Sequence, residues 1–187
     1  YKVVPVGITQ DGVFVPAEDN VERWALSDGP LPVVEFEGSR VEVSMDGSRQ
    51  LHVVNAAGER NLLATADVVF PVLHGPFGED GTMQGFLELA GLPYVGNGVF
   101  ASAAGMDKEH SKALFLQAGV PATPHVVIRE HAWKANREAV LAEVATLGGT
   151  PLFVKPARAG SSVGVSKVKD MAEFAAAVEL GLQHDSK

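Results

Sequence analysis

The strongest constraint on the fold is a continuous apolar run at residues 68–73 that leads directly into a glycine-rich loop. Such a run is typical of a strand buried on both faces of a sheet. The loop, residues 74–81, carries three glycines in eight residues, and residues 82–90 then repeat apolar side chains at helical spacing. A glycine and a proline end that helix, and residues 92–95 resemble a second strand. This order predicts a βαβ unit with a right-handed crossover and a parallel sheet.

The composition permits a packed core and excludes several classes of partner. Of the 187 residues, 46% are apolar and 20% are charged, enough for one large domain or two small ones. The 15 Lys and Arg against 23 Asp and Glu leave a formal charge of −8. A field of that sign repels phosphate backbones and anionic lipid, so we expect neither nucleic acid nor a membrane as the main partner. The absence of cysteine excludes disulfides and thiolate metal sites and fits a cytoplasmic location.

The first third of the chain indicates short antiparallel strands. Asp11-Gly12 and Asp46-Gly47 each separate two apolar stretches, and a glycine after aspartate supplies the positive φ of a tight hairpin turn. The chain opens at Tyr1 in the middle of an apolar stretch and closes on a polar stop, so we expect sequence to be missing at both ends.

The second half of the chain predicts a further set of helices and strands. Asp107 is expected to cap a helix that runs to about residue 118, and a capping box, Asp170-x-x-Glu173, opens the last helix. Small residues at 101–105 indicate a domain boundary near 101–107. We expect Trp24 and Trp133 to pack in the core or at its rim. Between the two helices the pattern predicts a strand at 125–129, a helix at 133–147, and strands at 151–156 and 163–169.

The loop at residues 74–81 is the first candidate site. It follows the carboxyl end of a predicted parallel strand, which is where open α/β sheets bind their ligands. Its glycines allow backbone amides to approach a ligand, and His74, Glu79 and Asp80 add titratable groups. The same pattern also fits a tight connector in which Asp80 or Thr82 caps the helix while His74 and Glu79 are solvated.

The second candidate is the segment 155–164. Lys155 ends an apolar strand, and Gly160-Ser161-Ser162 is small and rich in hydrogen-bond donors beside Arg158. Such a loop could cover a polyphosphate by charge and by backbone N–H donation. It is not a P-loop, because no Gly-Lys-Ser/Thr is present and the loop leads into a strand. The alternative is a hairpin loop whose Lys and Arg are ordinary surface charges.

Lys108 is the third candidate. A cation in the first turn of a helix opposes the macrodipole unless an anion lies there, so its position beside Asp107 hints at anion binding. The alternative is a surface lysine that extends its charge into water. No pair of carboxylates shows the spacing of a metal site, and no serine lies in a nucleophile-elbow pattern.

Taken together, these segments resemble the D-alanine–D-alanine ligase family. Residues 69–85, with His74-Gly75 and Gly78-Glu79-Asp80-Gly81, resemble its signature HGxxGEDGxxQG. Residues 92–96 and 101–108 look like the segments that follow, and residues 153–165 are similar to its glycine/serine phosphate loop. The order and spacing hold from about residue 67 to 169, whereas the region before residue 67 matches only in character.

The resemblance implies an α/β fold of the ATP-grasp superfamily in two parts. Residues 1–105 would form a Rossmann-like N-terminal substrate domain, the pre-ATP-grasp domain, without its first strand and glycine-rich motif. Residues 106–187 would form the central α+β lid subdomain of an ATP-grasp domain, without the C-terminal half of that domain.

The resemblance also implies an activity: ATP- and Mg²⁺-dependent joining of two D-alanines through an acyl phosphate, for peptidoglycan, by a cytoplasmic homodimer. Lys108 and Lys155 would hold the ATP phosphates. Ser161, as a catalytic residue, and Ser162 would lie in the lid loop near phosphate and substrate. His74 and Glu79 would border the first D-alanine.

The resemblance leaves two alternatives and one restriction. The Mg²⁺ ligands of the family would lie beyond residue 187, so we expect no metal ligand in this chain and no turnover by the chain alone. A D-alanine–D-lactate ligase differs in the missing half. A non-catalytic nucleotide-binding module of the same fold is the other alternative.

Overall fold

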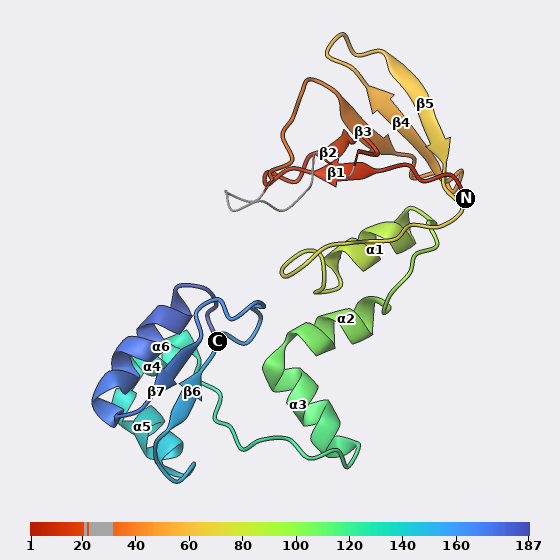
Figure 1. Cartoon of the computed structure of the whole chain (residues 1–187). Helices are drawn as coiled ribbons and strands as arrows, with labels where there is room; N and C mark the ends of the chain where they lie inside the picture. The colour runs from red at the N-terminus through yellow and green to blue at the C-terminus, as the bar shows by residue number, and fades with distance from the viewer. Residues whose placement is uncertain (21, 23–31) are drawn as a thin grey trace. The chain divides into compact units, whose positions relative to one another are not determined.

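The chain divides into two compact units, which we describe separately (Figure 1). A computed structural model describes residues 1–20, 22 and 32–187. Unit 1 comprises residues 1–70 and 86–95, and unit 2 comprises residues 71–85 and 96–187.

Unit 1 is built mainly from antiparallel strands. Both predicted Asp-Gly turns are confirmed, because Gly12 and Gly47 adopt φ of 82° and 79° between paired strands. A third strand of the second sheet, β5, was not predicted, since its sequence lacks a clear alternation of apolar and polar residues. The sheets are β1 (Val6–Ile8) with β2 (Phe14–Pro16), and β3 (Arg40–Val43), β4 (Gln50–Val54) and β5 (Arg60–Thr65) in that order.

The predicted βαβ unit is present in reduced form. Helix α1 (Thr82–Leu89) lies in sequence between two segments that meet in a parallel bridge between Val69 and Tyr94. The N–H of Val69 donates to the carbonyl of Pro93 at 2.8 Å, and that of Val95 donates to the carbonyl of Val69 at 2.9 Å.

The expectation that residues 68–73 form a strand buried on both faces is wrong. Val68, Phe70 and Val72 are each more than half exposed. Within the described residues, only the 92–95 segment pairs with this run, and Pro71 removes a backbone donor from it. A strand with one short bridge leaves its side chains uncovered.

Unit 2 combines helices with a two-stranded antiparallel sheet. The small residues at 101–105, expected to mark a domain boundary, lie within a helix over residues 99–106, because alanine-rich sequence favours helix. The elements are α2 (Val99–Met106), α3 (Lys108–Gln117), α4 (Glu130–Ala135), α5 (Arg137–Ala145), β6 (Leu152–Val154), β7 (Ser166–Val168), the short 3₁₀ helix η2 (Met171–Glu173) and α6 (Phe174–Leu182).

Two further predictions in unit 2 are corrected. The helix expected over 133–147 divides at Asn136, whose φ of −153° is not helical and whose side chain accepts a hydrogen bond from the N–H of Ala139. The strand expected at 125–129 is irregular, because among the described residues no neighbouring strand bonds to its backbone.

The core of unit 2 lies between α4, α5, α6 and the β6–β7 sheet. Trp133 is buried, as predicted, and its ring meets that of Phe174 edge-on at a centroid distance of 6.2 Å. Trp24 lies outside the described residues. The buried cluster consists of Trp133, Val140, Val144, Val168, Phe174, Ala177 and Val178.

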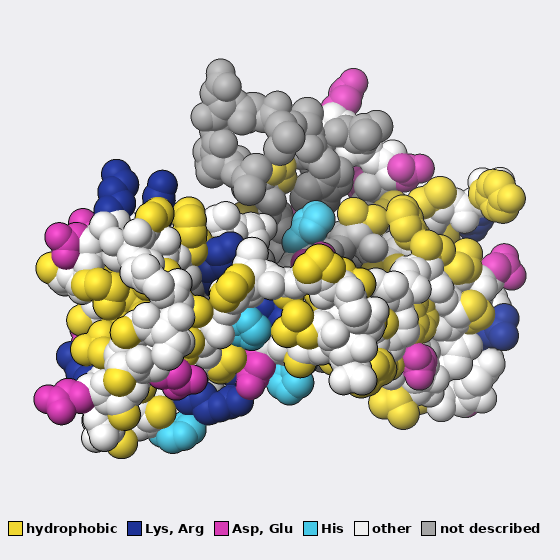
Figure 2. All heavy atoms as spheres, turned by 90° about the horizontal axis from the view of Figure 1, so that it is seen from below, with side chains coloured by type: hydrophobic (Ala, Val, Ile, Leu, Met, Phe, Trp, Pro, Cys, Tyr) yellow, Lys and Arg dark blue, Asp and Glu magenta, His cyan; other side chains and the backbone are white. Residues whose placement is uncertain are grey.

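Apolar side chains are also common on the surface. Figure 2 shows them scattered among polar and charged groups over the visible face. Phe70, Leu89 and Phe100 are among the large ones that are exposed. Within the described part of the chain, no helix has both the length and the hydropathy needed to cross a bilayer.

We predict that Phe174→Ala lowers the free energy of unfolding by about 3–5 kcal/mol, because it removes a buried ring from the core cluster of unit 2. Leu180→Ala on the same helix is the matched control, since Leu180 is 41% exposed, and should cost less than about 1 kcal/mol. Urea unfolding measures both. An equal loss of unfolding free energy in the two variants would contradict the assignment of Phe174 to the buried face of α6 and of Leu180 to its exposed face.

Candidate functional site

A cavity of about 530 Å³ opens in unit 2. Its walls come from the first turns of α3, the irregular segment 123–128, strand β6 with the residues on either side of it, and the inner face of α6. Val144, Leu147 and Lys187 complete the lining. Most of these side chains are apolar, with a few charged groups among them, which is the usual make-up of a small-molecule site.

Three lysines line this cavity without an acidic partner. Lys108 and Lys112 are four residues apart and therefore lie on one face of α3, and Lys155 follows β6 directly. None of the three forms an ion pair within the described part of the chain. Glu109, the acidic residue of the lining, is already paired with Arg129 and Lys187. The cavity therefore holds an excess of positive charge.

The charge of Lys155 destabilises the charged forms of Lys108 and Lys112. Burial lowers the pKa of Lys108, and the charge of Lys155 lowers it further, against the opposing effect of Asp107 and Asp185. Burial and the charge of Lys155 also lower the pKa of Lys112. A bound anion would relieve this repulsion, so the site favours a ligand with several negative charges.

Lys108 also ties the loop after β6 to α3. Its ammonium donates to the carbonyl of Ala159 at 2.7 Å and to that of Ala157 at 3.4 Å, and its backbone N–H donates to the carbonyl of Ala157 at 3.0 Å. The first turn of α3 therefore fixes the chain that leads into Gly160-Ser161-Ser162.

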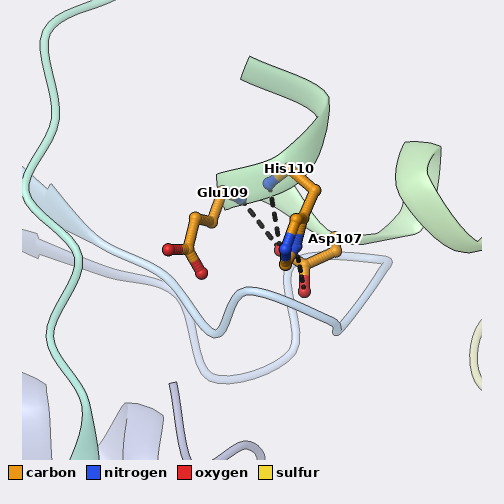
Figure 3. A group of neighbouring side chains, drawn as sticks. All are labelled: Asp107, Glu109 and His110. Carbon is orange, nitrogen blue, oxygen red and sulfur yellow. Dashed lines mark hydrogen bonds and ion pairs between the residues drawn. The ribbon is translucent and has the colours of Figure 1, made fainter. Parts of the chain in front are cut away.

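Asp107 caps α3, as predicted. One carboxylate oxygen accepts the N–H groups of Glu109 and His110 at 3.0 and 3.3 Å, and the other accepts the Lys187 ammonium at 2.6 Å. The same ammonium donates to Glu109 at 2.6 Å. Figure 3 shows Asp107 and His110 directed toward each other and Glu109 turned away from them.

Asp107, Glu109 and His110 are close enough together to be considered as metal ligands. The Lys187 ammonium, however, lies 2.6 Å from an oxygen of each carboxylate. A cation already neutralises the pair, so this cluster does not fit a Mg²⁺ site.

A second ion pair holds the segment after β6. The carboxylate of Asp185 accepts the backbone N–H of Arg158 at 2.8 Å and also pairs with its guanidinium. The Asp185 side chain is almost fully buried. Burial tends to raise the pKa of Asp185, but the hydrogen bonds and charge of Arg158 lower it.

Ser161 and Ser162 lie in an exposed loop. Both adopt left-handed backbone conformations, with φ of 48° and 59°, which non-glycine residues rarely do. The loop closes through hydrogen bonds from the N–H of Val163 to the carbonyl of Gly160 and from that of Val165 to the carbonyl of Ser162. Neither serine belongs to the cavity lining.

The loop at residues 74–81 is closed by its own carboxylates. Glu79 accepts the N–H of Gly75 at 2.6 Å. Asp80 accepts the N–H groups of Phe77 and Thr82, at 2.8 and 3.0 Å, and so caps α1. His74 is exposed, and neither it nor Glu79 lines the cavity. Of the residues predicted from sequence, the structure therefore brings together Lys108 and Lys155.

Sequence reasoning missed Lys112 and the Arg158–Asp185 pair. Lys112 could have been found from its position one helical turn after Lys108. The partnership of Arg158 with Asp185, which are 27 residues apart, left no local signal in the sequence.

Two family models match the chain. One, described as "D-ala D-ala ligase N-terminus", covers residues 1–97, and one described as "D-ala D-ala ligase C-terminus" covers residues 114–187. The chain belongs to the D-alanine–D-alanine ligase family. The family resemblance and the α/β ATP-grasp fold class, both inferred from the sequence, are thereby confirmed.

Named relatives agree with this assignment. The chain is 51% identical over 192 residues to a D-alanine–D-alanine ligase of Mycobacterium sp. strain KMS, covering all of this chain and 50% of that protein. It is 45% identical over 195 residues to one of Streptomyces coelicolor, again covering all of this chain and 50% of that protein. The chain thus spans about half the length of the curated relatives it matches.

Solved structures of the family have the same fold. The VanG D-Ala:D-Ser ligase of Enterococcus faecalis matches with a TM-score of 0.77 and 34% identity, over 99% of this chain and 51% of that one. The D-alanine–D-alanine ligase of Coxiella burnetii matches with a TM-score of 0.65 and 33% identity, over 79% of this chain and 39% of that one.

We predict that acid weakens this site's scaffold through Asp107. Burial acts to raise the pKa of Asp107, but hydrogen bonds from Lys187 and His110 lower it from 3.8 to about 2. A carboxyl whose pKa falls on folding stabilises the fold above its unfolded pKa, and that contribution is lost between about pH 5 and pH 2.

Asp107→Asn should therefore remove about 1–2 kcal/mol of unfolding free energy at pH 7 and flatten the acid limb of the stability curve. Urea unfolding at a series of pH values measures both. Asp46→Asn is the control, because Asp46 is exposed and its pKa is lowered mainly by local hydrogen bonds from Ser48. An unchanged acid limb in Asp107→Asn would contradict the prediction.

Proposed function

We propose that this chain supplies the N-terminal and central parts of an enzyme that joins two D-alanines at the expense of ATP. Residues 1–105 serve as the substrate domain and residues 106–187 as the lid subdomain over ATP. The observation that supports this most is the cavity in which Lys108 and Lys155 face the same space without an acidic partner. Family membership supplies the reaction.

The chemistry needs such a site. A carboxylate resists attack by an amine because its own charge repels electron density. Transfer of the γ-phosphoryl group of ATP to the carboxylate of the first D-alanine releases ADP and forms an acyl phosphate. The amine of the second D-alanine then attacks the carbonyl carbon, phosphate leaves with the bonding pair, and a peptide bond forms. Phosphoryl transfer gathers negative charge, which fixed cations stabilise.

Each predicted site residue takes a role in this proposal. Lys108 and Lys155 bind the phosphates, and Lys108 also holds the loop that leads to the two serines. Ser161 and Ser162 close over the phosphate and the substrate, with Ser161 closest to the reaction, and exclude the water that would hydrolyse the acyl phosphate. His74 and Glu79 border the first D-alanine, and the bond from Gly75 to Glu79 sets the shape of that loop.

The family implies Mg²⁺ as well as ATP. The one candidate cluster of acidic and histidine groups within the described residues holds the Lys187 ammonium instead. We therefore assign no Mg²⁺ ligand among the residues that the structure describes. The product serves peptidoglycan synthesis in this proposal, and the enzyme acts in the cytoplasm as a homodimer.

The identity of the second substrate is a separate question. One of the similar solved structures is that of a D-Ala:D-Ser ligase, which is 34% identical to this chain over the aligned residues. We favour D-alanine because the 45–51% identical relatives carry the name D-alanine–D-alanine ligase. D-lactate or D-serine as second substrate, or a nucleotide-binding module without turnover, are the competing outcomes of the test.

The test uses a protein of full family length that contains this chain. We predict that it releases ADP only when given D-alanine, and that Lys155→Ala lowers kcat/KM about 100-fold, because a phosphate-binding cation is lost. Lys169→Ala is the control, because Lys169 is exposed and outside the cavity. The coupled assay for ADP, with mass analysis of the dipeptide, reports the result.

Absence of ADP release with D-alanine would overturn the proposal. Greater ADP release with D-lactate or D-serine than with D-alanine as the second substrate would change the proposed second substrate. The 187-residue chain alone should form no dipeptide, and turnover by it would show that the site is complete within these residues.

A further inference from the structure

Lys112 is a cation of the cavity that the proposed function does not use. It lies one helical turn after Lys108 on α3 and lines the same cavity as Lys108 and Lys155. Its side chain is partly buried, whereas most lysines extend into water. A partly buried cation needs a reason for its position.

The hydrogen bonds that Lys112 makes within the chain use only some of its N–H donors. Its ammonium donates to the hydroxyl of Thr123 at 2.9 Å and to the carbonyl of the same residue at 3.2 Å. An ammonium has three N–H donors, so these two neutral acceptors leave one donor available. Thr123 also lines the cavity, and this anchor holds the Lys112 head beside the wall.

The charge of Lys112 is not neutralised within the described residues. No described carboxylate pairs with it, and the charge that acts on it most is the positive charge of Lys155. In contrast, Lys187 in the same lining contacts two carboxylates. The chain as a whole is acidic, with a net charge of −8, so a pocket with three unpaired lysines is not explained by composition.

We propose that Lys112 is a third phosphate-binding cation, which meets the polyphosphate of the nucleotide together with Lys108 and Lys155. This inference rests on the proposed function for the identity of its ligand. The Lys108 ammonium donates hydrogen bonds to the carbonyls of Ala157 and Ala159, and the Lys112 ammonium donates to Thr123. Both ammonium groups are thus fixed in place before a ligand arrives, which reduces the entropy lost on binding.

The rival explanation is structural. Lys112 could serve only to fasten the irregular segment 123–128 to α3, without touching the ligand. If Lys112 binds phosphate, its charge determines nucleotide affinity. If its role is structural, its contact with Thr123 does. Salt separates them, because ionic strength screens a charge–phosphate attraction and leaves a neutral contact unchanged.

The experiment measures Mg-ADP binding by calorimetry, with the full-length protein, at about 20 and 500 mM salt. We expect Lys112→Gln to weaken binding about five- to tenfold at low salt and about twofold at high salt, as a lost charged contact requires. Lys112→Arg and Thr123→Val should remain within about twofold of the unchanged protein, because both retain the positive charge. Lys169→Gln is the matched control for loss of a surface lysine.

Three results would overturn the inference: Mg-ADP affinity unchanged in Lys112→Gln, a loss independent of salt, or an equal loss in Thr123→Val. Circular dichroism of each variant confirms that it is folded. The D-alanine-dependent release of ADP by the unchanged protein is measured separately. If that activity is absent while Mg-ADP binds, the proposed function fails and the role of Lys112 is still decided by the binding series.

Discussion

The Lys187 ammonium between Asp107 and Glu109 joins segments of unit 2 that lie 78 and 80 residues apart in sequence. Each carboxylate is largely removed from water, and an unpaired charge there would be costly. The same contact region includes the bond from the N–H of Ala157 to the carbonyl of Lys187 and that from the N–H of Lys108 to the carbonyl of Ala157. The position of the cavity lysines therefore depends on the pairing of Asp107 and Glu109 with Lys187.

This division of charges explains how an acidic chain can maintain a basic cavity. Glu109 and Asp107 are the carboxylates nearest in sequence to Lys108, and Lys187, Arg129 and the helix N-terminus satisfy them. If they were free, they would neutralise the lysines and compete with an anionic ligand. Because these carboxylates are already paired, Lys108, Lys112 and Lys155 keep an excess of positive charge in the cavity.

Local signals allowed part of the fold to be predicted. The Asp-Gly turns, the cap at Asp107 and the helix after Gly81 depend on residues within a few positions of one another. The failures depend on distant partners. Whether residues 68–73 are buried is decided by what covers them, and whether residues 125–129 form a strand is decided by a neighbour's backbone. The break at Asn136 was local, but the apolar stripe of residues 133–147 masked it.

Prediction of the site from sequence was also limited by contacts between residues that are distant in the chain. Local patterns and the family resemblance selected Lys108 and Lys155, and the cavity brings these two together. The spacing of Lys112 from Lys108 is visible in the sequence, but its contact with Thr123 forms only where the chain returns after α3. In the loop at residues 74–81, Glu79 and Asp80 satisfy backbone N–H groups of their own loop. Both oxygens of Asp80 are occupied in this way, whereas Glu79 uses one oxygen to shape the loop and can still face a substrate with the other. A structural role and a binding role for Glu79 are therefore compatible in one arrangement of the loop.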